Sequence, residues 1–450
     1  HPVFPSVTRC NAASLVTGRY PGRHGLTANR LMVREYDARE SIPAMPPELD
    51  QVAQKTGRVL LTPTLGEILA KFGQEYIAIG VGTTGNAYLQ HPNVELVGGG
   101  TIHPEFTRPS SLEQQIMARF GPWPQEARPN TPRFAHAVRV MTEFLLPERN
   151  PQVALLWSSE PDKAQHAAGV GSQLSDTSIR EADQQFGQLI VWLQQTGRLD
   201  NTDLLVLSDH GYSTITHVID LESQLRAAGF PPGGRTGGVV VAPNGGAALF
   251  YTHQQDPATA RRLAFWLMTQ PWCGNLLASQ AAGEIPGTLP AVLAGIEGPR
   301  APEIAMSFRW DSEPNQAGYP GRVFSTGGSA GAGQHGSMSQ HELQNILFAR
   351  GPSFKRGVSV DSPTGNVDLL PTTLRLLGNT TAIKSEQEFD GRVLQEALVG
   401  EGKLSESDWS VETREAEVTL SSGTYRQKIN RARVGKTSYL EHGSAGFVGG

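Results

Sequence analysis

Four short segments carry side chains that could hold a metal ion or an anion, and most lie where an expected strand ends. Thr8 opens an expected helix, whose free backbone N–H groups and positive dipole end favour a bound anion. The other three segments supply two carboxylates and three imidazoles: Asp162, His166, Asp209, His210 and His335. This mixture of oxygen and nitrogen ligands suits zinc or a similar divalent ion, and it divides naturally into two metal sites.

Two metal sites beside a hydroxyl predict transfer of a phosphoryl group. A neutral hydroxyl is a weak nucleophile. An ion bound to the Thr8 oxygen would lower the pKa of the hydroxyl and so make it a stronger one. A second ion ~3.5–4 Å away would offset charge on the leaving group or on the attacking water. We therefore expect hydrolysis of a phosphate ester through a phosphorylated Thr8, followed by attack of water.

Each segment taken alone also has a structural interpretation. Asp162 and His166 could form a polar helical face, Asp209 and His210 could cap a strand, and His335 could be an ordinary loop residue. Their joint appearance favours chemistry, because ligands gather at the carboxyl ends of the strands in open α/β sheets.

Strand-like and helix-like segments alternate along most of the chain, which predicts a doubly wound α/β fold with a mostly parallel sheet and helices on both faces. The expected helices are 8–17, 64–72, 135–146, 179–195 and 367–377. The expected strands are 76–81, 153–157, 203–207 and 345–349. The apolar run at 153–157 predicts a strand that is buried on both faces.

The composition changes in two places, which predicts the domain organisation. Glycine-rich stretches bracket residues 231–333, so we expect an insertion or cap on a catalytic domain of residues 1–400. Thr, Val and Tyr are frequent after residue 400, so a small β extension is expected at 401–450.

Composition and charge exclude several classes of protein. The net charge of −5 comes without a basic block, so binding to duplex nucleic acid is not expected. No apolar run approaches the ~18 residues of a membrane-spanning helix. The two cysteines, Cys10 and Cys273, do not indicate a disulfide framework.

The motifs resemble those of the type I phosphodiesterase/nucleotide pyrophosphatase family, within the alkaline phosphatase superfamily, over roughly residues 1–400. The resemblance rests on FPSVTRCNAASLVTGRYPGRHG at 4–25, EPDKAQHAAG at 160–169, SDHG at 208–211 and GQHG at 333–336. It implies an alkaline phosphatase-like fold and a small-molecule phosphodiester or pyrophosphate substrate. It also implies a periplasmic or secreted location.

The resemblance also implies a role for each site residue. Thr8 would be the nucleophile, and Asn29 with the backbone N–H of Arg9 would stabilise a phosphoryl oxygen. The first of two divalent ions, zinc or alternatively manganese, would bind Asp162, His166 and His335. The second would bind Asp209, His210 and the Thr8 oxygen. The family adds an aspartate from upstream of the nucleophile to the second ion. Residues 1–7 contain no acid, so we expect that ligand to lie outside this chain.

Three alternatives are weighed against a diesterase. A sulfatase needs Cys or Ser where this chain has Thr8, and is disfavoured. A phosphomonoesterase or phosphonate hydrolase would add lysines in the first half, but none occurs between Lys71 and Lys163, although Arg108 or Arg128 could substitute. A catalytically incomplete relative that only binds phosphate ligands is the alternative outside the enzymes.

Overall fold

A parallel sheet in the order β4–β3–β5 lies between two layers of helices. The computed structural model describes residues 1–379, 381–382, 389–402 and 404–449. The three strands are β3 (Tyr76–Gly80), β4 (Gly100–Ile102) and β5 (Val153–Trp157). Both neighbours run parallel to β3, as the alternation of strand-like and helix-like segments predicts.

Helices cover both faces of this sheet because residues along β3 alternate between two hydrophobic cores. Tyr76 and Ala78 pack in one core, and Ile77 and Ile79 pack in the other. The first core is built with α1 (Thr8–Thr17), α4 (Leu65–Lys71), α5 (Thr84–Gln90) and α14 (Leu369–Leu376). The second is built with α7 (Ser110–Phe120), α8 (Thr131–Val140), the π-helix η1 (Met141–Arg149) and α10 (Gln173–Gln195). The expected doubly wound α/β architecture is confirmed.

One expectation about the sheet is wrong. The residues of β5 are half-buried or exposed, although their apolar run predicted burial on both faces. Among the described strands β5 pairs with β3 alone, and β6 (Leu204–Leu207) pairs with β16 (Leu347–Arg350) alone, in antiparallel register. One edge of each strand is therefore without a strand partner in this part of the chain, which leaves its side chains partly open to solvent.

A second, four-stranded sheet in the order β13–β14–β7–β15 connects two of the predicted site segments. Its strands are β7 (Ser213–Val218), β13 (Trp310–Pro314), β14 (Pro320–Ser325) and β15 (Gly333–Gln334). Strand β7 begins three residues after His210, and β15 ends directly before His335. Because Ser213 lies opposite Gln334 in the antiparallel register, the two histidines are brought side by side.

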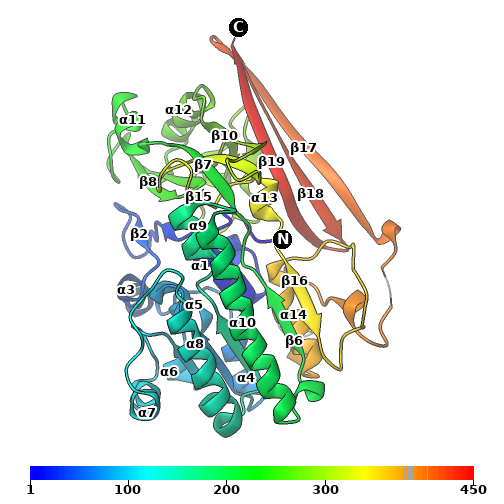
Figure 1. Cartoon of the computed structure of the whole chain (residues 1–450). Helices are drawn as coiled ribbons and strands as arrows, with labels where there is room; N and C mark the ends of the chain where they lie inside the picture. The colour runs from blue at the N-terminus through cyan, green and yellow to red at the C-terminus, as the bar shows by residue number, and fades with distance from the viewer. Residues whose placement is uncertain (380, 383–388, 403, 450) are drawn as a thin grey trace.

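Two further sheets pack above this region (Figure 1). The five-stranded sheet has the order β11–β10–β12–β9–β8 and packs against α11 (Leu221–Ala227) and α12 (Pro257–Met268). Its strands are β8 (Val239–Asn244), β9 (Ala247–Thr252), β10 (Cys273–Ala278), β11 (Leu289–Pro290) and β12 (Ile304–Phe308). The long C-terminal sheet contains β17 (Trp409–Leu420), β18 (Gly423–Val434) and β19 (Thr437–Gly449). The division into a catalytic domain, an insertion at 231–333 and an extension from 401 stays a prediction.

Short elements complete the described part of the chain. The short helices are α2 (Pro21–His24), α6 (Val94–Val97), α9 (Asp162–Ala168) and α13 (Gln340–Leu343), and α3 (Pro46–Thr56) is longer. Strands β1 (Arg30–Leu31) and β2 (Ile42–Pro43) form a two-stranded ribbon. Among the described residues, no helix combines the length and the hydrophobicity needed to cross a bilayer.

Candidate functional site

The helix α1 places Thr8 at the centre of the candidate site. Thr8 is the first residue of this helix, and the preceding Val7 offers no side chain to cap it. The helix ends at Gly18, whose φ of 63° is left-handed and whose N–H bonds to Ser14 O at 2.9 Å. Thr8 Oγ1 lies 3.2 Å from Nε2 of His210, 202 residues further along the chain. The hydroxyl predicted to react therefore faces a predicted metal ligand.

Asp162, His166 and His335 form what we call the first group. Asp162 begins α9, and His166 follows one turn later on the same face. Asp162 Oδ1 lies 3.6 Å from Nε2 of His166 and 3.6 Å from Nε2 of His335. One ligand atom from each of the three side chains lies within 4.8 Å of the others, a spacing that could hold one metal ion.

The three imidazoles are held in one orientation by backbone carbonyl groups. Nδ1 of His166 contacts Gly333 O at 3.1 Å, Nδ1 of His335 contacts Ser6 O at 2.8 Å, and Nδ1 of His210 contacts Gly211 O at 3.0 Å. A carbonyl oxygen only accepts, so each Nδ1 carries a hydrogen, and a ring with this single hydrogen presents the lone pair of Nε2 to the site. This is the arrangement found in metal-ligating histidines.

The donor set fits a cation. Nε2 of His166 and Nε2 of His335 are 3.2 Å apart, and both are acceptors in the tautomers that the carbonyl groups impose. Two lone pairs at this distance repel each other unless a positive charge lies between or beside them. Burial and the neighbouring imidazoles of His210 and His166 also lower the pKa of His335 well below its usual value, so the ring stays neutral and able to bind a metal.

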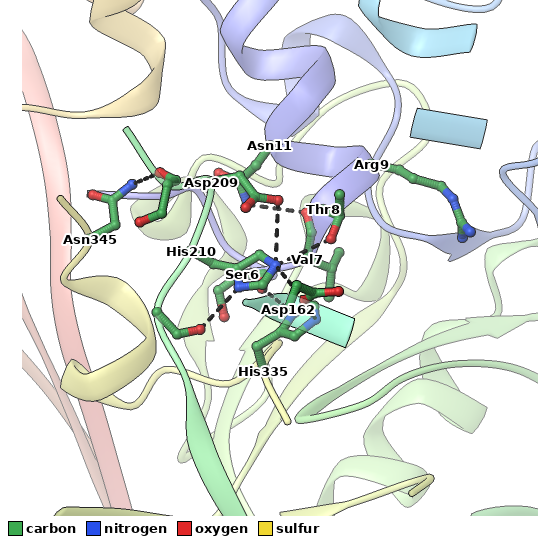
Figure 2. A network of polar contacts seen from close by, with 12 residues as sticks. Ser6, Val7, Thr8, Arg9, Asn11, Asp162, Asp209, His210, His335 and Asn345 are labelled. Carbon is green, nitrogen blue, oxygen red and sulfur yellow. Dashed lines mark hydrogen bonds and ion pairs between the residues drawn. The ribbon is translucent and has the colours of Figure 1, made fainter. Parts of the chain in front are cut away.

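Asp209 and His210, with the oxygen of Thr8, form what we call the second group. Nε2 of His210 lies 3.4 Å from Asp209 Oδ2 and 3.9 Å from Asp162 Oδ1, so the two groups are contiguous (Figure 2). Asp209 Oδ2 is buried and has no hydrogen-bond donor among the described residues. Burial and the charge of Asp162 raise the pKa of Asp209, whereas His210 and the Thr8 hydroxyl lower it. A divalent ion would satisfy this oxygen and remove the cost of burying it.

Asn29 and Arg9 lie together, but in a different relation from the expected one. The backbone N–H of Arg9 donates to Asn29 Oδ1 at 2.8 Å. The two groups therefore bond to each other, and the carboxamide Nδ2 of Asn29 is left as the donor that a phosphoryl oxygen could use.

Two further residues support the first group. Tyr212 donates its hydroxyl hydrogen to Asp162 Oδ1 at 2.5 Å, and its ring packs edge-on against His166 and His335. Glu342 is fully buried and accepts hydrogen bonds from Ser337 N at 2.6 Å and Ser6 Oγ at 3.2 Å. Glu342 thus ties the loop after His335 to the loop before Thr8.

The sequence offered different signals for these two supports. Tyr212 directly follows the SDHG segment, so proximity marked it, although its bond to Asp162 could not be read. Glu342 gave no signal, because a buried carboxylate and a surface carboxylate look alike in one sequence.

Comparisons with known proteins agree with this fold. The family model for type I phosphodiesterase / nucleotide pyrophosphatase matches residues 1–269. An ectonucleotide pyrophosphatase/phosphodiesterase of Caenorhabditis elegans is 22% identical over 395 residues, which are 84% of this chain and 42% of that protein. The chain thus spans less than half the length of this relative.

Solved structures of similar proteins share the fold. Murine ectonucleotide pyrophosphatase/phosphodiesterase 5 superposes with a TM-score of 0.58 at 17% identity, over 84% of this chain and 85% of that one. Phosphonoacetate hydrolase from Sinorhizobium meliloti, in complex with phosphonoformate, gives a TM-score of 0.55 at 16% identity, over 82% and 84% of the two chains. Because the family model covers more than half of its 450 residues, the chain belongs to the type I phosphodiesterase/nucleotide pyrophosphatase family, which is named for the hydrolysis of phosphodiester and pyrophosphate bonds.

Proposed function

We propose that this protein hydrolyses a phosphodiester or pyrophosphate bond in a small molecule, with Thr8 as the nucleophile. One observation carries the proposal. Oγ1 of Thr8 and the Nε2 atoms of three carbonyl-anchored histidines converge beside two carboxylates, although they come from four distant segments of the chain. Figure 2 shows Thr8, His210, His335 and the two carboxylates of this set. Such a set can bind a phosphoryl group, hold its charge and present a hydroxyl to it.

The covalent steps can be written with this chain's own atoms. Oγ1 of Thr8 forms a bond to phosphorus as the bond to the leaving oxygen breaks, and the hydroxyl proton of Thr8 passes to the leaving oxygen or to solvent. Nε2 of His210 lies 3.2 Å from Oγ1 and keeps this hydroxyl in place, on the side where both atoms would share one ion. Water then forms a bond to the phosphorus as the bond to Oγ1 breaks, and one proton of that water passes to Oγ1.

The residues present fit two divalent ions. Asp162, His166 and His335 would hold one, and Asp209, His210 and Oγ1 of Thr8 would hold the other. Bound zinc, or manganese as the second choice, would lower the pKa of the Thr8 hydroxyl and offset charge on the transferred phosphoryl group. Imidazole nitrogens favour zinc over manganese, which prefers oxygen ligands.

Asn29 would stabilise the phosphoryl oxygen through Nδ2. The N–H of Arg9 holds the other end of the carboxamide at 2.8 Å, so in this geometry Arg9 contributes by fixing the direction in which Nδ2 points. A donor that is already oriented needs no rearrangement when charge develops on the oxygen.

The test compares two chromogenic substrates, bis-p-nitrophenyl phosphate and p-nitrophenyl phosphate, with and without zinc, for the wild type and Thr8→Ala. Zinc-dependent hydrolysis that is faster on the diester and absent in Thr8→Ala is the expected result. Faster turnover of the monoester would instead indicate a phosphomonoesterase or phosphonate hydrolase with the same core. If the protein neither turns over a substrate nor binds metal, the proposed hydrolysis is wrong, and the alternative is a relative that only binds phosphate ligands.

The relatives' name also bears on location. The C. elegans and murine proteins are ectonucleotide enzymes by name, and we propose that this protein likewise acts outside the cytoplasm. Cell fractionation with an antibody against the chain would test this, and recovery in the cytosolic fraction would contradict it.

A further inference from the structure

The side chain of Arg9 is a half-buried cation that has no acidic partner among the residues that the structure describes. Its terminal nitrogens lie 3.4 Å from Asn29 O and 3.4 Å from Thr83 Oγ1, at the long end of the hydrogen-bond range. Its Nε is buried and has no acceptor. Both contacts of the guanidinium are therefore weak and made to neutral oxygens.

This lack of a partner separates Arg9 from other arginines around the same sheet. Arg108 is paired with Asp50 at 2.6 Å, and Arg133 is paired with Glu105 at 2.9 Å. Removing a guanidinium from water costs free energy that an acidic partner normally offsets. At Arg9 no acidic side chain among the described residues offsets this cost, and its buried Nε lacks an acceptor.

The position of Arg9 connects this cation to the reacting hydroxyl. Arg9 follows Thr8 in the first turn of α1, and its backbone N–H holds Asn29. Figure 2 shows the side chain leaving the helix away from the imidazoles, so it lies beside the metal ligands and not among them. Gly85 leaves room for it, because a Cβ there would lie 2.7 Å from Arg9 Nε.

We propose that the guanidinium of Arg9 is a second anion-binding point, which takes the phosphate adjacent to the phosphorus that Thr8 attacks. The inference rests on the proposed function and deepens it, because it selects a pyrophosphate linkage over a simple diester. A planar guanidinium can donate two parallel hydrogen bonds to phosphate, which is the geometry that an arginine free of carboxylates can offer.

The kinetic test uses two substrates that share a nucleoside and differ in the charge of the leaving group. Thymidine 5′-triphosphate releases pyrophosphate, and p-nitrophenyl thymidine 5′-phosphate releases nitrophenolate. We expect Arg9→Gln to lower kcat/KM for the triphosphate at least about tenfold more than for the nitrophenyl ester, as loss of a charge-assisted hydrogen bond does. Arg9→Lys should restore part of this difference.

A matched control removes a neighbouring charge. Arg30 follows Asn29, and its guanidinium is satisfied by Ser41 Oγ at 2.8 Å and Ser41 O at 2.7 Å. We expect Arg30→Gln to leave the ratio between the two substrates as in the wild type. Equal losses on both substrates in Arg9→Gln, or the same selective loss in Arg30→Gln, would overturn the proposal.

Binding separates this proposal from the proposed function. The zinc-loaded protein is titrated calorimetrically with methylenebisphosphonate, which is not hydrolysed, and with inorganic phosphate. We expect the wild type to prefer the bisphosphonate and Arg9→Gln to lose that preference while it keeps the wild-type circular dichroism spectrum. A preference for the bisphosphonate without turnover of any substrate would contradict the proposed hydrolysis but support the anion-binding role of Arg9. Turnover without this preference would support the hydrolysis and contradict the role of Arg9.

Discussion

The two halves of the candidate site differ in how open they are. In the first group the side chains of Asp162 and His166 are 38% and 37% exposed and that of His335 is 6% exposed, whereas in the second group those of Asp209 and His210 are 15% and 2% exposed. An ion in the first group would thus meet solvent beside Asp162 and His166, and an ion in the second would be more enclosed. Thr8 itself is half-buried, so its hydroxyl is open to substrate on one side and lies against shielded ligands on the other.

The halves also differ in completeness. The first group brings three ligand atoms within 4.8 Å of one another, enough for a metal site that leaves a position open. In the described residues the second group offers Asp209, His210 and the Thr8 oxygen, and one of its carboxylate oxygens is buried without a donor. The comparison teaches that the two ions would have separate roles and separate stabilities.

Thr8→Ala tests the reacting half and should give the largest effect. It removes the proposed nucleophile, so kcat should fall at least about 10³-fold. Initial rates of nitrophenolate release measure this, with Thr8→Ser as the control that keeps a hydroxyl. Wild-type rates in Thr8→Ala would show that the enclosed half is not where reaction occurs.

Single histidine substitutions would show whether the two groups bind their ions independently. His166→Ala removes a donor from the first group alone, and His210→Ala removes one from the second. Each should weaken one of two bound ions by at least about 100-fold, because loss of a residue that only supports a ligand already costs 10–100-fold. Elemental analysis and cobalt titration measure how many ions each variant binds, and each variant serves as the control for the other. Loss of both ions from either variant would mean that the halves act as one site.

Tyr212→Phe should weaken the first group by a smaller factor. The change keeps the ring against His166 and His335 but removes the hydrogen bond to Asp162 Oδ1. We expect metal affinity to fall about tenfold in the first group and not in the second. Competition with a fluorescent chelator measures the two affinities. An equal fall in both would place Tyr212 in support of the whole site.

A pH change should act on the packing of α1, the helix that carries Thr8. His24 is buried, bonds to Ser14 Oγ at 2.9 Å, and has its pKa lowered by burial to about 3. The ring is therefore neutral in the folded protein but gains a proton below ~6.5 when unfolded. Stability present above pH 6.5 is thus lost as pH falls, by about 1.3 kcal/mol between pH 7 and 5.5.

Urea unfolding of the metal-free protein at pH 7 and pH 5.5 measures this loss. His24→Gln keeps a donor and an acceptor but cannot be protonated, so its pH dependence should be weaker by that amount. The same slope in both proteins would contradict the assignment to His24.

The sequence alone was sufficient for the elements whose signals are local. The helix at 8–17 ends at Gly18 because a left-handed residue there favours glycine, and the structure has Thr8–Thr17. The strand at 153–157 also has the predicted bounds. Its exposure was not predicted, because burial depends on which strands lie beside it and not on its own composition.

The residues of the candidate site could also be predicted from the sequence. Thr8, Asp162, His166, Asp209, His210 and His335 were expected near one sheet edge, because each follows a strand or opens a helix. The tertiary structure decided what spacing cannot express. Backbone carbonyls from distant loops set the tautomers of His166 and His335, Tyr212 bonds to Asp162, and the amide of Arg9 turns toward Asn29. In the described part of the chain the guanidinium of Arg9 has no acid beside it for the same reason: partners are chosen by position in space, which a single sequence does not record.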